Sequence, residues 1–435
     1  MKQPLSIFWF RRDLRLNDNA GLYHALKDNN PILCLFIFDP EILDKLEDRD
    51  DARVTFIYQT IEKLKHDLEH HHSSLLVKYA KPHHAWDEIL KEYEVKAVYT
   101  NHDYEPYAHE RDSELKKLFD KNNIAFNTYK DQVIFEKDEV VKDDGKPYTV
   151  FTPYKRKWYG KLTSFYLQTY PTEKYLKNLY KTQPLQIPTL KHLDFVDSTA
   201  SFPPKRYKDV IEDYAEKRDY PAVKGTSHIG LHLRFGTVSI RQLATDACHA
   251  HEKTWLNELI WRDFYAMILY HFPQTAKHAF KPDYDRIRWR NNEDEFKAWC
   301  EGKTGYPLVD AGMRQLNATG YMHNRVRMVV ASFLSKHLLI DWRWGEHYFA
   351  RKLLDYEMAS NVGGWQWAAG CGNDAAPYFR VFNPELQLKK FDPKLEYIKK
   401  WVPEYADFSK YPQPIVDHAF ARDRCLKAFK AALSK

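Results

Sequence analysis

The stretch ILCLFIF, at residues 32 to 38, decides the fold of the first part of this 435-residue chain. It is short, nearly continuous in apolar residues and rich in β-branched and aromatic side chains, which is typical of a strand buried on both faces. Similar runs alternate with helical patterns such as 52 to 70 and 109 to 121, and this alternation predicts an α/β domain over residues 1 to 130 with a doubly wound, Rossmann-like parallel sheet. The other predicted strands are SIFWF at 6 to 10, SLLVKY at 74 to 79, AVYT at 97 to 100 and IAFNTY at 124 to 129.

Glycine is scarce in this predicted sheet domain. Gly21 is the only glycine before Gly145. A dinucleotide bound at a Rossmann-like sheet needs a glycine-rich turn, because only glycine lets the backbone approach the phosphates closely. We therefore expect any dinucleotide to bind elsewhere in the chain.

The length of 435 residues predicts two domains, because it exceeds the size at which a single core usually stops growing. Residues 131 to 205 contain seven prolines and little sustained periodicity, which predicts an interdomain linker. Residues 206 to 435 are helical in pattern almost throughout and contain 12 of the 15 glycines. We expect a large all-α domain there.

Charge and aromatic composition leave a nucleic-acid partner open. The net charge of +6 is only mildly basic and does not by itself indicate nucleic acid. However, 16 of the 23 arginines follow residue 205, and nine of the 12 tryptophans lie from Trp255 onward. Guanidinium groups beside aromatic faces suit a phosphate backbone with stacked bases. A large helical core with a charged surface would have the same composition.

The five cysteines are scattered, odd in number and in no metal-ligand spacing. They indicate a reduced, cytoplasmic protein without a bound metal. No apolar run approaches the ~20 residues that span a bilayer, and the N-terminus leads into a strand-like segment rather than a signal peptide. We expect a monomer without membrane association.

The stretch NVGGWQWAAGCGNDAAPYFRVFN, at residues 361 to 383, combines features that a packed core does not need. Gly363 and Gly364 are tolerated where a backbone turns sharply or approaches another group closely. Trp365 and Trp367 offer broad aromatic faces, and the small residues after them leave space. The stretch predicts a flat group held against these rings, although a tight helix junction with a tryptophan-rich core has the same pattern.

A second segment, WLNELIWRDFY at 255 to 265, places charged and aromatic side chains along one stripe of a helix. Glu258 and Arg262 lie on this stripe between aromatic rings. Because buried charges are costly unless they are paired, the stripe is a poor core face. It predicts a polar pocket floored by aromatic rings.

A third segment, YMHNRVRM at 321 to 328, repeats this logic. Asn324 and Met328 share a helix face at a spacing of four residues, whereas Arg325 and Arg327 are expected to point elsewhere. The segment predicts a second wall of the same kind of pocket.

In a fourth segment, GTSHIGLHLRFGTVS at 225 to 239, Thr226 and Ser227 follow a glycine and precede a helical pattern. Hydroxyls and free backbone N–H groups at a helix N-terminus form a seat for phosphate. The segment is compatible with such a seat, but Gly-Thr-Ser before a helix is usually only a helix cap.

Taken together, these segments resemble the photolyase and cryptochrome family, and most closely its class I cyclobutane pyrimidine dimer photolyases. The resemblance spans nearly the whole chain and is densest from 305 to 328 and from 361 to 369. It implies that the sheet domain accompanies a helical domain that holds FAD in a U-shape, which agrees with the scarcity of glycine in the sheet domain. The matching segments are FWFRRDLRLNDNAGL at 8 to 22, RDYPAVKGTS at 218 to 227, WLNELIWRDFY at 255 to 265, GYPLVDAGMRQLNATGYMHNRVRM at 305 to 328 and NVGGWQWAA at 361 to 369.

The resemblance implies FAD, active in its reduced form, as the cofactor. Arg327 would pair with Asp355 beside the isoalloxazine, and Asn361 would face flavin N5. A neutral amide can accept a hydrogen bond from the reduced ring, whereas a carboxylate would add negative charge there. The family's Thr-Ser-x-Leu-Ser pattern is lost at Ile229 and Gly230, so no side-chain hydroxyl acts at Gly230. The full implied FAD set is Tyr214, Thr226 and Ser227 at the phosphates, with Trp255, Arg262, Arg327, Asp355, Glu357 and Asn361.

The same resemblance implies DNA containing pyrimidine dimers as the partner. A dimer is poorly stacked, so flipping it out of the duplex costs less than flipping an intact base. Excited reduced FAD would donate an electron to the dimer, its cyclobutane bonds would break, and the electron would return. The lesion pocket would contain Glu258, Trp261, Asn324, Met328 and Trp367; the DNA contacts would come from Arg218, Trp261, Arg325, Trp367 and Gln387; and Trp365, Trp342 and Trp289 would relay electrons to oxidised flavin.

Several relatives of different activity remain as alternatives. A 6-4 photolyase typically carries paired histidines where this chain has His323 and Asn324, and a DASH-type cryptochrome tends to lack residues equivalent to Met328 and Trp367. A signalling cryptochrome, a blue-light receptor, usually adds a long C-terminal tail. The antenna chromophore stays open between methenyltetrahydrofolate, an 8-hydroxy-deazaflavin, another flavin and none, because Tyr107 and Ala108 replace the Asn-Glu pair of folate-binding members.

Overall fold

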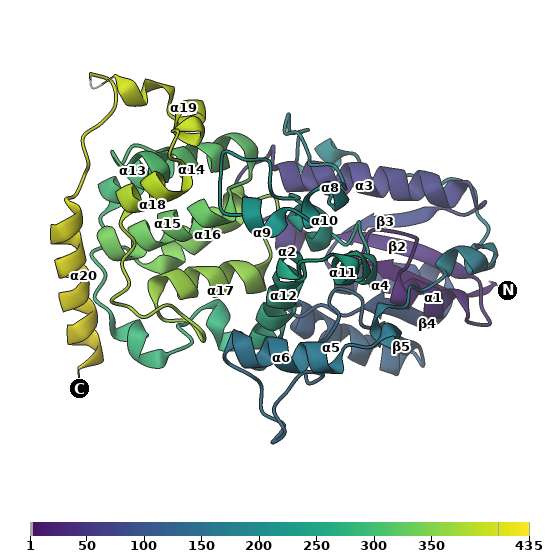
Figure 1. Ribbon diagram of the computed structural model, residues 1–435. Helices are drawn as coiled ribbons and strands as arrows, with labels where there is room; N and C mark the ends of the chain where they lie inside the picture. Colours follow the sequence, from purple (N-terminus) through teal and green to yellow (C-terminus); the bar gives the residue numbers. More distant parts are fainter. Residues whose placement is uncertain (1–2, 408, 435) are drawn as a thin grey trace. The chain divides into compact units, whose positions relative to one another are not determined.

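The computed structural model describes residues 3–407 and 409–434, and the chain divides into two compact units (Figure 1). The first unit comprises Met1–Glu136, Lys161–Lys205 and Ile229–His249. The second comprises Lys137–Gly160, Arg206–His228 and Ala250–Lys435. The first contains the strands, drawn in purple to blue, and the second contains most of the helices.

In the described residues, the first unit is built on a five-stranded parallel sheet in the order β3-β2-β1-β4-β5. Ile7 of the central strand β1 pairs with Leu33 on one side and Val98 on the other. Strand β2 is buried along its whole length, as the apolar run predicts, and the predicted doubly wound sheet is confirmed. The strands are β1 (Pro4–Phe10), β2 (Ile32–Phe38), β3 (Leu75–Tyr79), β4 (Glu94–Asn101) and β5 (Ala125–Tyr129).

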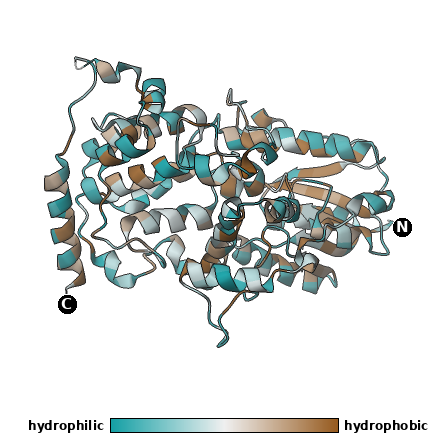
Figure 2. Cartoon of the chain, in the orientation of Figure 1, coloured by the Kyte–Doolittle hydropathy of each residue, from teal (hydrophilic) through white to brown (hydrophobic). Residues whose placement is uncertain are grey.

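Helices connect the strands of this sheet, because two parallel strands need a crossover connection and cannot be joined by a tight turn. Figure 2 shows apolar strands next to the largely hydrophilic surface of α3. The helices predicted at 52 to 70 and 109 to 121 correspond to α3 and α5. The helices of the first unit are α1 (Ala20–Leu26), α2 (Pro40–Leu43), α3 (Ala52–Glu69), α4 (Pro82–Glu92), α5 (Pro106–Lys121), α7 (Ser164–Leu167), α10 (Gly230–Arg234) and α11 (Ile240–His249).

A buried ion network attaches residues 229–249 to the sheet. Arg241, on α11, donates to Asp18 at 2.8 Å and to Asp131 at 2.7 Å, and Arg15 also contacts Asp131 at 2.7 Å. Burial alone would raise the pKa of Asp131, but the two guanidiniums outweigh it and hold that pKa below its usual value. Removing either arginine would leave two buried carboxylates with a single guanidinium, and such uncompensated buried charge is strongly destabilising.

The compact units are interleaved along the chain, whereas the boundaries expected from sequence, 1–130, 131–205 and 206–435, are contiguous. The segment expected as a linker also contains α6 (Phe151–Lys161), whose Phe151, Tyr154 and Trp158 are buried. The interleaving of the units and the burial of α6 both depend on contacts between residues far apart in the chain. The local proline content gives no information about such contacts.

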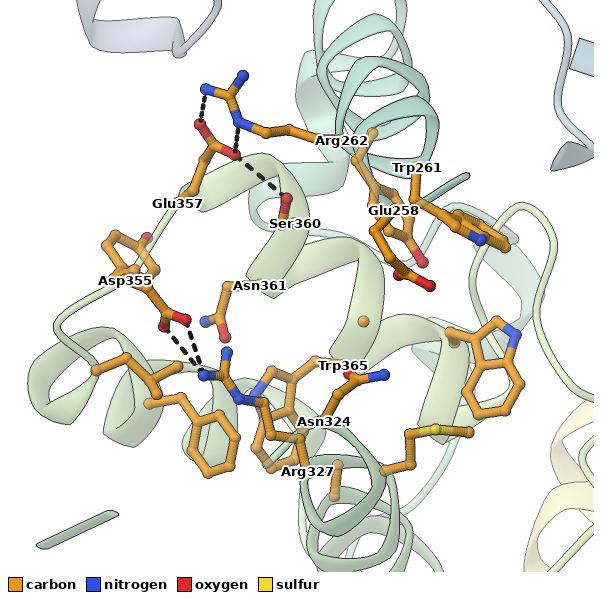
Figure 3. Close-up of a pocket in the computed structure, with 18 of the residues that line it drawn as sticks. Glu258, Trp261, Arg262, Asn324, Arg327, Asp355, Glu357, Ser360, Asn361 and Trp365 are labelled. Atoms are coloured by element: carbon orange, nitrogen blue, oxygen red, sulfur yellow. Dashed lines mark hydrogen bonds and ion pairs between the residues drawn. The ribbon is translucent and has the colours of Figure 1, made fainter. Parts of the chain in front are cut away.

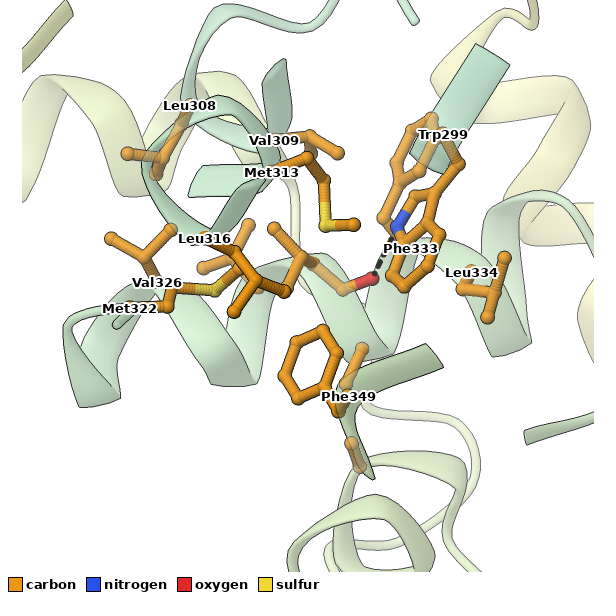
Figure 4. Packing of buried hydrophobic residues seen from close by; sticks show 14 of the residues in the cluster. Trp299, Leu308, Val309, Met313, Leu316, Met322, Val326, Phe333, Leu334 and Phe349 are labelled. Atoms are coloured by element: carbon orange, nitrogen blue, oxygen red, sulfur yellow. Dashed lines mark hydrogen bonds between the residues drawn. The ribbon is translucent and has the colours of Figure 1, made fainter. Parts of the chain in front are cut away.

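The second unit is a helical assembly around one large apolar core. Figure 4 shows part of it, where Trp299 donates from Nε1 to the carbonyl oxygen of Val330 at 3.1 Å. Gly312 allows α14 and α15 to approach closely, because a Cβ there would lie closer than van der Waals contact to Val326. Its further helices are α8 (Lys208–Ile211), α9 (Tyr214–Lys217), α12 (Thr254–His271), α13 (Glu293–Glu301), α14 (Pro307–Thr319), α15 (Asn324–Ser332), α16 (Trp342–Lys352), α17 (Met358–Ala369), α18 (Pro384–Phe391), α19 (Glu396–Trp401) and α20 (His418–Leu433).

Across the described residues, every helix is too short or too polar to cross a membrane.

Candidate functional site

The second unit contains an open cavity of about 410 Å³ (Figure 3). Helices α12, α15, α16 and α17 and the loop at 353–357 supply its walls. Aromatic rings, paired charges and amides converge there, as is typical of a ligand-binding cavity. The sequence-predicted residues that line it are Arg218, Glu258, Trp261, Arg262, Asn324, Arg327, Met328, Asp355, Glu357, Asn361, Trp365 and Trp367.

Helix α12 forms the first wall. Glu258, Trp261, Arg262 and Tyr265 line the cavity from one face of this helix, as their spacing predicts. The Trp261 ring stacks on Phe151, with centroids 3.6 Å apart and planes 6° from parallel. The sequence reasoning missed Phe151, which comes from a segment more than 100 residues earlier and has no local signal.

Two arginine–carboxylate pairs also line the cavity. Arg262 donates to both oxygens of Glu357 at 3.0 and 2.8 Å, and Arg327 donates to both oxygens of Asp355 at 3.1 and 2.9 Å. The Arg262 pair is bidentate through Nε and Nη2, which orients both partners. Arg327 contacts Asp355 through Nη2 alone, and its Nε donates to the Met322 carbonyl oxygen at 2.7 Å. The expected pairing of Arg327 with Asp355 is present.

The orientation expected for Arg327 relative to its neighbours is wrong. Arg327 lines the same cavity as Asn324 and Met328 instead of pointing elsewhere. The reason is helical geometry, because α15 begins at Asn324 and positions three and four residues apart share a face. Arg325 does point away, toward Asp219 at 2.6 Å and over the ring of Phe391.

Asn361 is oriented by a carboxylate that the sequence reasoning missed. Its Nδ2 donates to Oε1 of Glu346 at 2.9 Å and to the Glu346 carbonyl oxygen at 3.1 Å. Both donors are engaged, so Oδ1 is left to accept a hydrogen bond in the cavity. Burial raises the pKa of Glu346, and the bond from Asn361 opposes this shift.

Glu258 is paired in a way that sequence did not predict. Arg218, expected at the DNA backbone, forms an ion pair with it. The two side chains are 27% and 32% exposed, so water reaches the pair and weakens it. Burial raises the pKa of Glu258, and the Arg218 guanidinium acts in the opposite direction.

The glycines beside the tryptophans have distinct roles. Gly363 packs under the ring of Tyr265, and a Cβ on Gly345 would overlap the ring of Trp365. Gly364 lines the cavity, and a Cβ there would meet no atom within 4 Å. Gly363 and Gly345 permit close approach of neighbouring rings, as expected for Gly363. Gly364 keeps the cavity open.

The two tryptophans on α17 differ in environment. Trp365 is 2% exposed, and within the described part of the chain its ring meets Phe349 at 5.0 Å and Trp299 at 6.0 Å. Trp367 is partly buried and lies 6.4 Å from Phe382. Trp365 therefore joins the cavity to the aromatic core, and Trp367 stands at the cavity edge.

The remaining predicted residues lie outside this lining. The Thr226 hydroxyl shares a hydrogen bond with the Tyr321 hydroxyl at 3.2 Å. The next helix, α10, begins at Gly230, so Thr226 and Ser227 lie in the loop before it, and their contact with phosphate stays a prediction. His323 caps α15 through Nδ1, and burial lowers its pKa to about 4. The others are Tyr214, Ser227, Trp255, Arg325, Gln387, Trp289 and Trp342.

A parallel-sheet unit combined with a helical unit that contains an aromatic, ion-paired cavity defines a two-part, ligand-binding protein. Residues 6–174 match the family model for DNA photolyase, and residues 255–410 match the FAD binding domain of DNA photolyase. The deoxyribodipyrimidine photo-lyase of Synechococcus sp. is 37% identical, over 99% of this chain and 96% of that protein.

Solved structures agree. A bacterial class III photolyase from Agrobacterium tumefaciens superposes with a TM-score of 0.87 at 31% identity, covering 99% of this chain and 98% of that one. An archaeal photolyase from Sulfolobus tokodaii, solved with two FAD molecules, gives a TM-score of 0.85 at 33% identity, covering 98% and 99%. The chain belongs to the photolyase family. It is a lyase of DNA repair and a flavoprotein with FAD as its cofactor.

The donor set of the cavity fits FAD. Two oriented arginine–carboxylate pairs and the free Oδ1 of Asn361 offer hydrogen bonds to a flavin and ribose, and the Trp365 ring offers an apolar face. The open position beside Gly364 leaves room for a ring.

Proposed function

We propose that this protein splits cyclobutane pyrimidine dimers in DNA under blue light, as class I photolyases do. One observation carries the proposal: the five residues assigned to the lesion line the same cavity as five of the residues assigned to FAD, namely Arg262, Arg327, Asp355, Glu357 and Asn361. Reduced FAD, when bound and excited by light, supplies the electron that opens the dimer.

The flavin side of the proposed site is held by paired charges. Arg327 and Asp355 would lie beside the isoalloxazine, with Glu357 oriented by Arg262 toward the ribose. Asn361 would accept from flavin N5–H, since Glu346 occupies its amide donors. Tyr214, Thr226 and Ser227, outside the cavity lining, remain the proposed phosphate contacts.

The lesion side is apolar at its walls and polar at its floor. Trp261 and Trp367 would contact the flipped bases from two sides. The Trp261 ring is held in place by stacking on Phe151. Glu258 and Asn324 would hydrogen-bond the base edges, and Met328 would fill the irregular space between them. Burial raises the pKa of Glu258, the Arg218 guanidinium opposes this shift, and Glu258 would stabilise the dimer radical anion through a hydrogen bond.

Arg325 and Gln387 would hold the backbone around the lesion, and Arg218 would position Glu258. Monomeric state, cytoplasmic location and the Trp365, Trp342 and Trp289 relay stay predictions. The antenna chromophore is testable from the absorption spectrum of the purified protein, in which an antenna band adds to the flavin bands.

Repair assays on oligonucleotides that differ only in the lesion identify the substrate. The photoreduced protein, under blue light, should restore a thymine cyclobutane dimer and leave a 6-4 photoproduct in the same sequence unchanged. His323 supports this selectivity, because it is buried as a helix cap and does not line the cavity. Repair of the 6-4 lesion alone would overturn the proposal, and binding without repair of either lesion would favour a receptor.

A further inference from the structure

The aromatic contacts of Trp365 lead away from the cavity in a direction that the expected relay does not use. Trp365 meets Trp299, on α13, with ring centroids 6.0 Å apart and planes at 69°. Trp299 is fully buried and meets Tyr348, on α16, at 5.7 Å and 67°. Tyr348 is partly buried, and its hydroxyl donates to Asn317 Oδ1 at 2.7 Å near the surface. Three redox-active rings therefore run in contact from cavity to surface.

Neighbouring aromatics brace this route. Phe296 stacks on Trp299 at 5.8 Å and 17°, and Phe349 lies 6.1 Å from the same ring. Trp299 Nε1 donates to the backbone carbonyl of Val330, which is too weakly basic to take the proton. An oxidised Trp299 ring would therefore stay a radical cation, which can take an electron from the neighbouring Tyr348. The Tyr348 side chain, by contrast, is partly exposed, and its phenol donates to the side chain of Asn317 near the surface, from where the proton of an oxidised tyrosine can pass to water.

We infer that Trp365, Trp299 and Tyr348 form a second electron path into the cavity, with Tyr348 as its outer end. The inference rests on the proposed placement of FAD against Trp365. Trp365 gives one electron to photoexcited oxidised FAD, and Trp299 gives one electron to the oxidised Trp365. Tyr348 then gives one electron to Trp299 and its phenolic proton to water. A thiol in solution returns an electron to the tyrosyl radical, which takes a proton back from water.

The test uses the FAD-containing protein with the expected route blocked. Trp342→Phe should keep part of its flavin photoreduction with a thiol present, and Trp342→Phe with Tyr348→Phe should lose most of what remains. Tyr348→Phe keeps the ring and removes only the hydroxyl. Tyr405→Phe, another partly buried tyrosine on the edge of the same core, is the matched control and should change nothing.

A spectroscopic measurement separates this path from a packing effect. After a laser flash, Trp342→Phe should give a transient tyrosyl signal whose electron paramagnetic resonance lines narrow when the tyrosines are ring-deuterated, and Tyr348→Phe should remove it. Equal photoreduction in the single and double variants would overturn the second path while leaving the cavity assignment intact. If Trp365→Phe itself leaves photoreduction unchanged, the proposed FAD placement fails instead.

Discussion

Gly345→Ala tests whether the close contact of α16 with Trp365 maintains the cavity wall. A Cβ at this buried position would lie 2.6 Å from Cδ2 of Leu334 and still closer to the Trp365 ring. Alanine in a helix gains ~1 kcal/mol over glycine from propensity. Overpacking a buried ring costs ~1–3 kcal/mol, and the overlap with both Trp365 and Leu334 places this substitution at the upper end. We expect a net loss of roughly 1–2 kcal/mol of unfolding free energy.

Thermal unfolding followed by circular dichroism measures this loss, and flavin fluorescence follows release of the cofactor. For a unit of this size, 1 kcal/mol corresponds to ~2–4 °C in Tm, so Tm should fall by roughly 2–8 °C. Gly160→Ala is the control, because a Cβ added at that exposed helical position would meet no atom within 4 Å and should be neutral or slightly stabilising. An equal rise in Tm for both variants would refute the packing of Trp365 against Gly345.

The remaining predictions concern charge, electron transfer and DNA. Burial raises the folded pKa of Glu258 above its unfolded value of 4.5, so ionisation of Glu258 destabilises the folded protein as the pH rises above that unfolded value. The unfolding free energy of Glu258→Gln relative to the wild type should therefore increase with pH in this range in urea titrations, and a pH-independent difference would contradict the shift. Trp365→Phe should slow photoreduction of oxidised FAD by an external donor, while the chemically reduced variant still repairs DNA; photoreduction at the wild-type rate would exclude Trp365 as the inner relay residue. Arg325→Ala should weaken binding to damaged and undamaged duplexes alike and flatten the salt dependence of log K by roughly 0.9 for each phosphate that its guanidinium neutralises. Trp367→Ala should instead lose mainly the preference for dimer-containing DNA, by ~1–3 kcal/mol per stacked base, and an unchanged preference would remove Trp367 from the lesion pocket.

Local pattern was enough for the sheet and for one wall of the cavity. The run at 32 to 38 predicted a fully buried strand because a parallel strand shielded on both faces needs apolar residues without alternation. The spacing of Glu258, Trp261 and Arg262 predicted one helix face, because helical periodicity is a property of neighbouring residues alone. The same rule applied at a spacing of three residues would have placed Arg327 beside Asn324.

Partners that lie far apart in the chain required the folded structure. Arg218 meets Glu258, Glu346 orients Asn361, and Phe151 supports Trp261, although none of these pairs has a local signature. The segment 229–249 joins the sheet unit through buried charges although its own pattern is simply helical. Periodicity reports which face of an element is buried, but the identity of the residues that it meets depends on how helices from distant parts of the chain pack together.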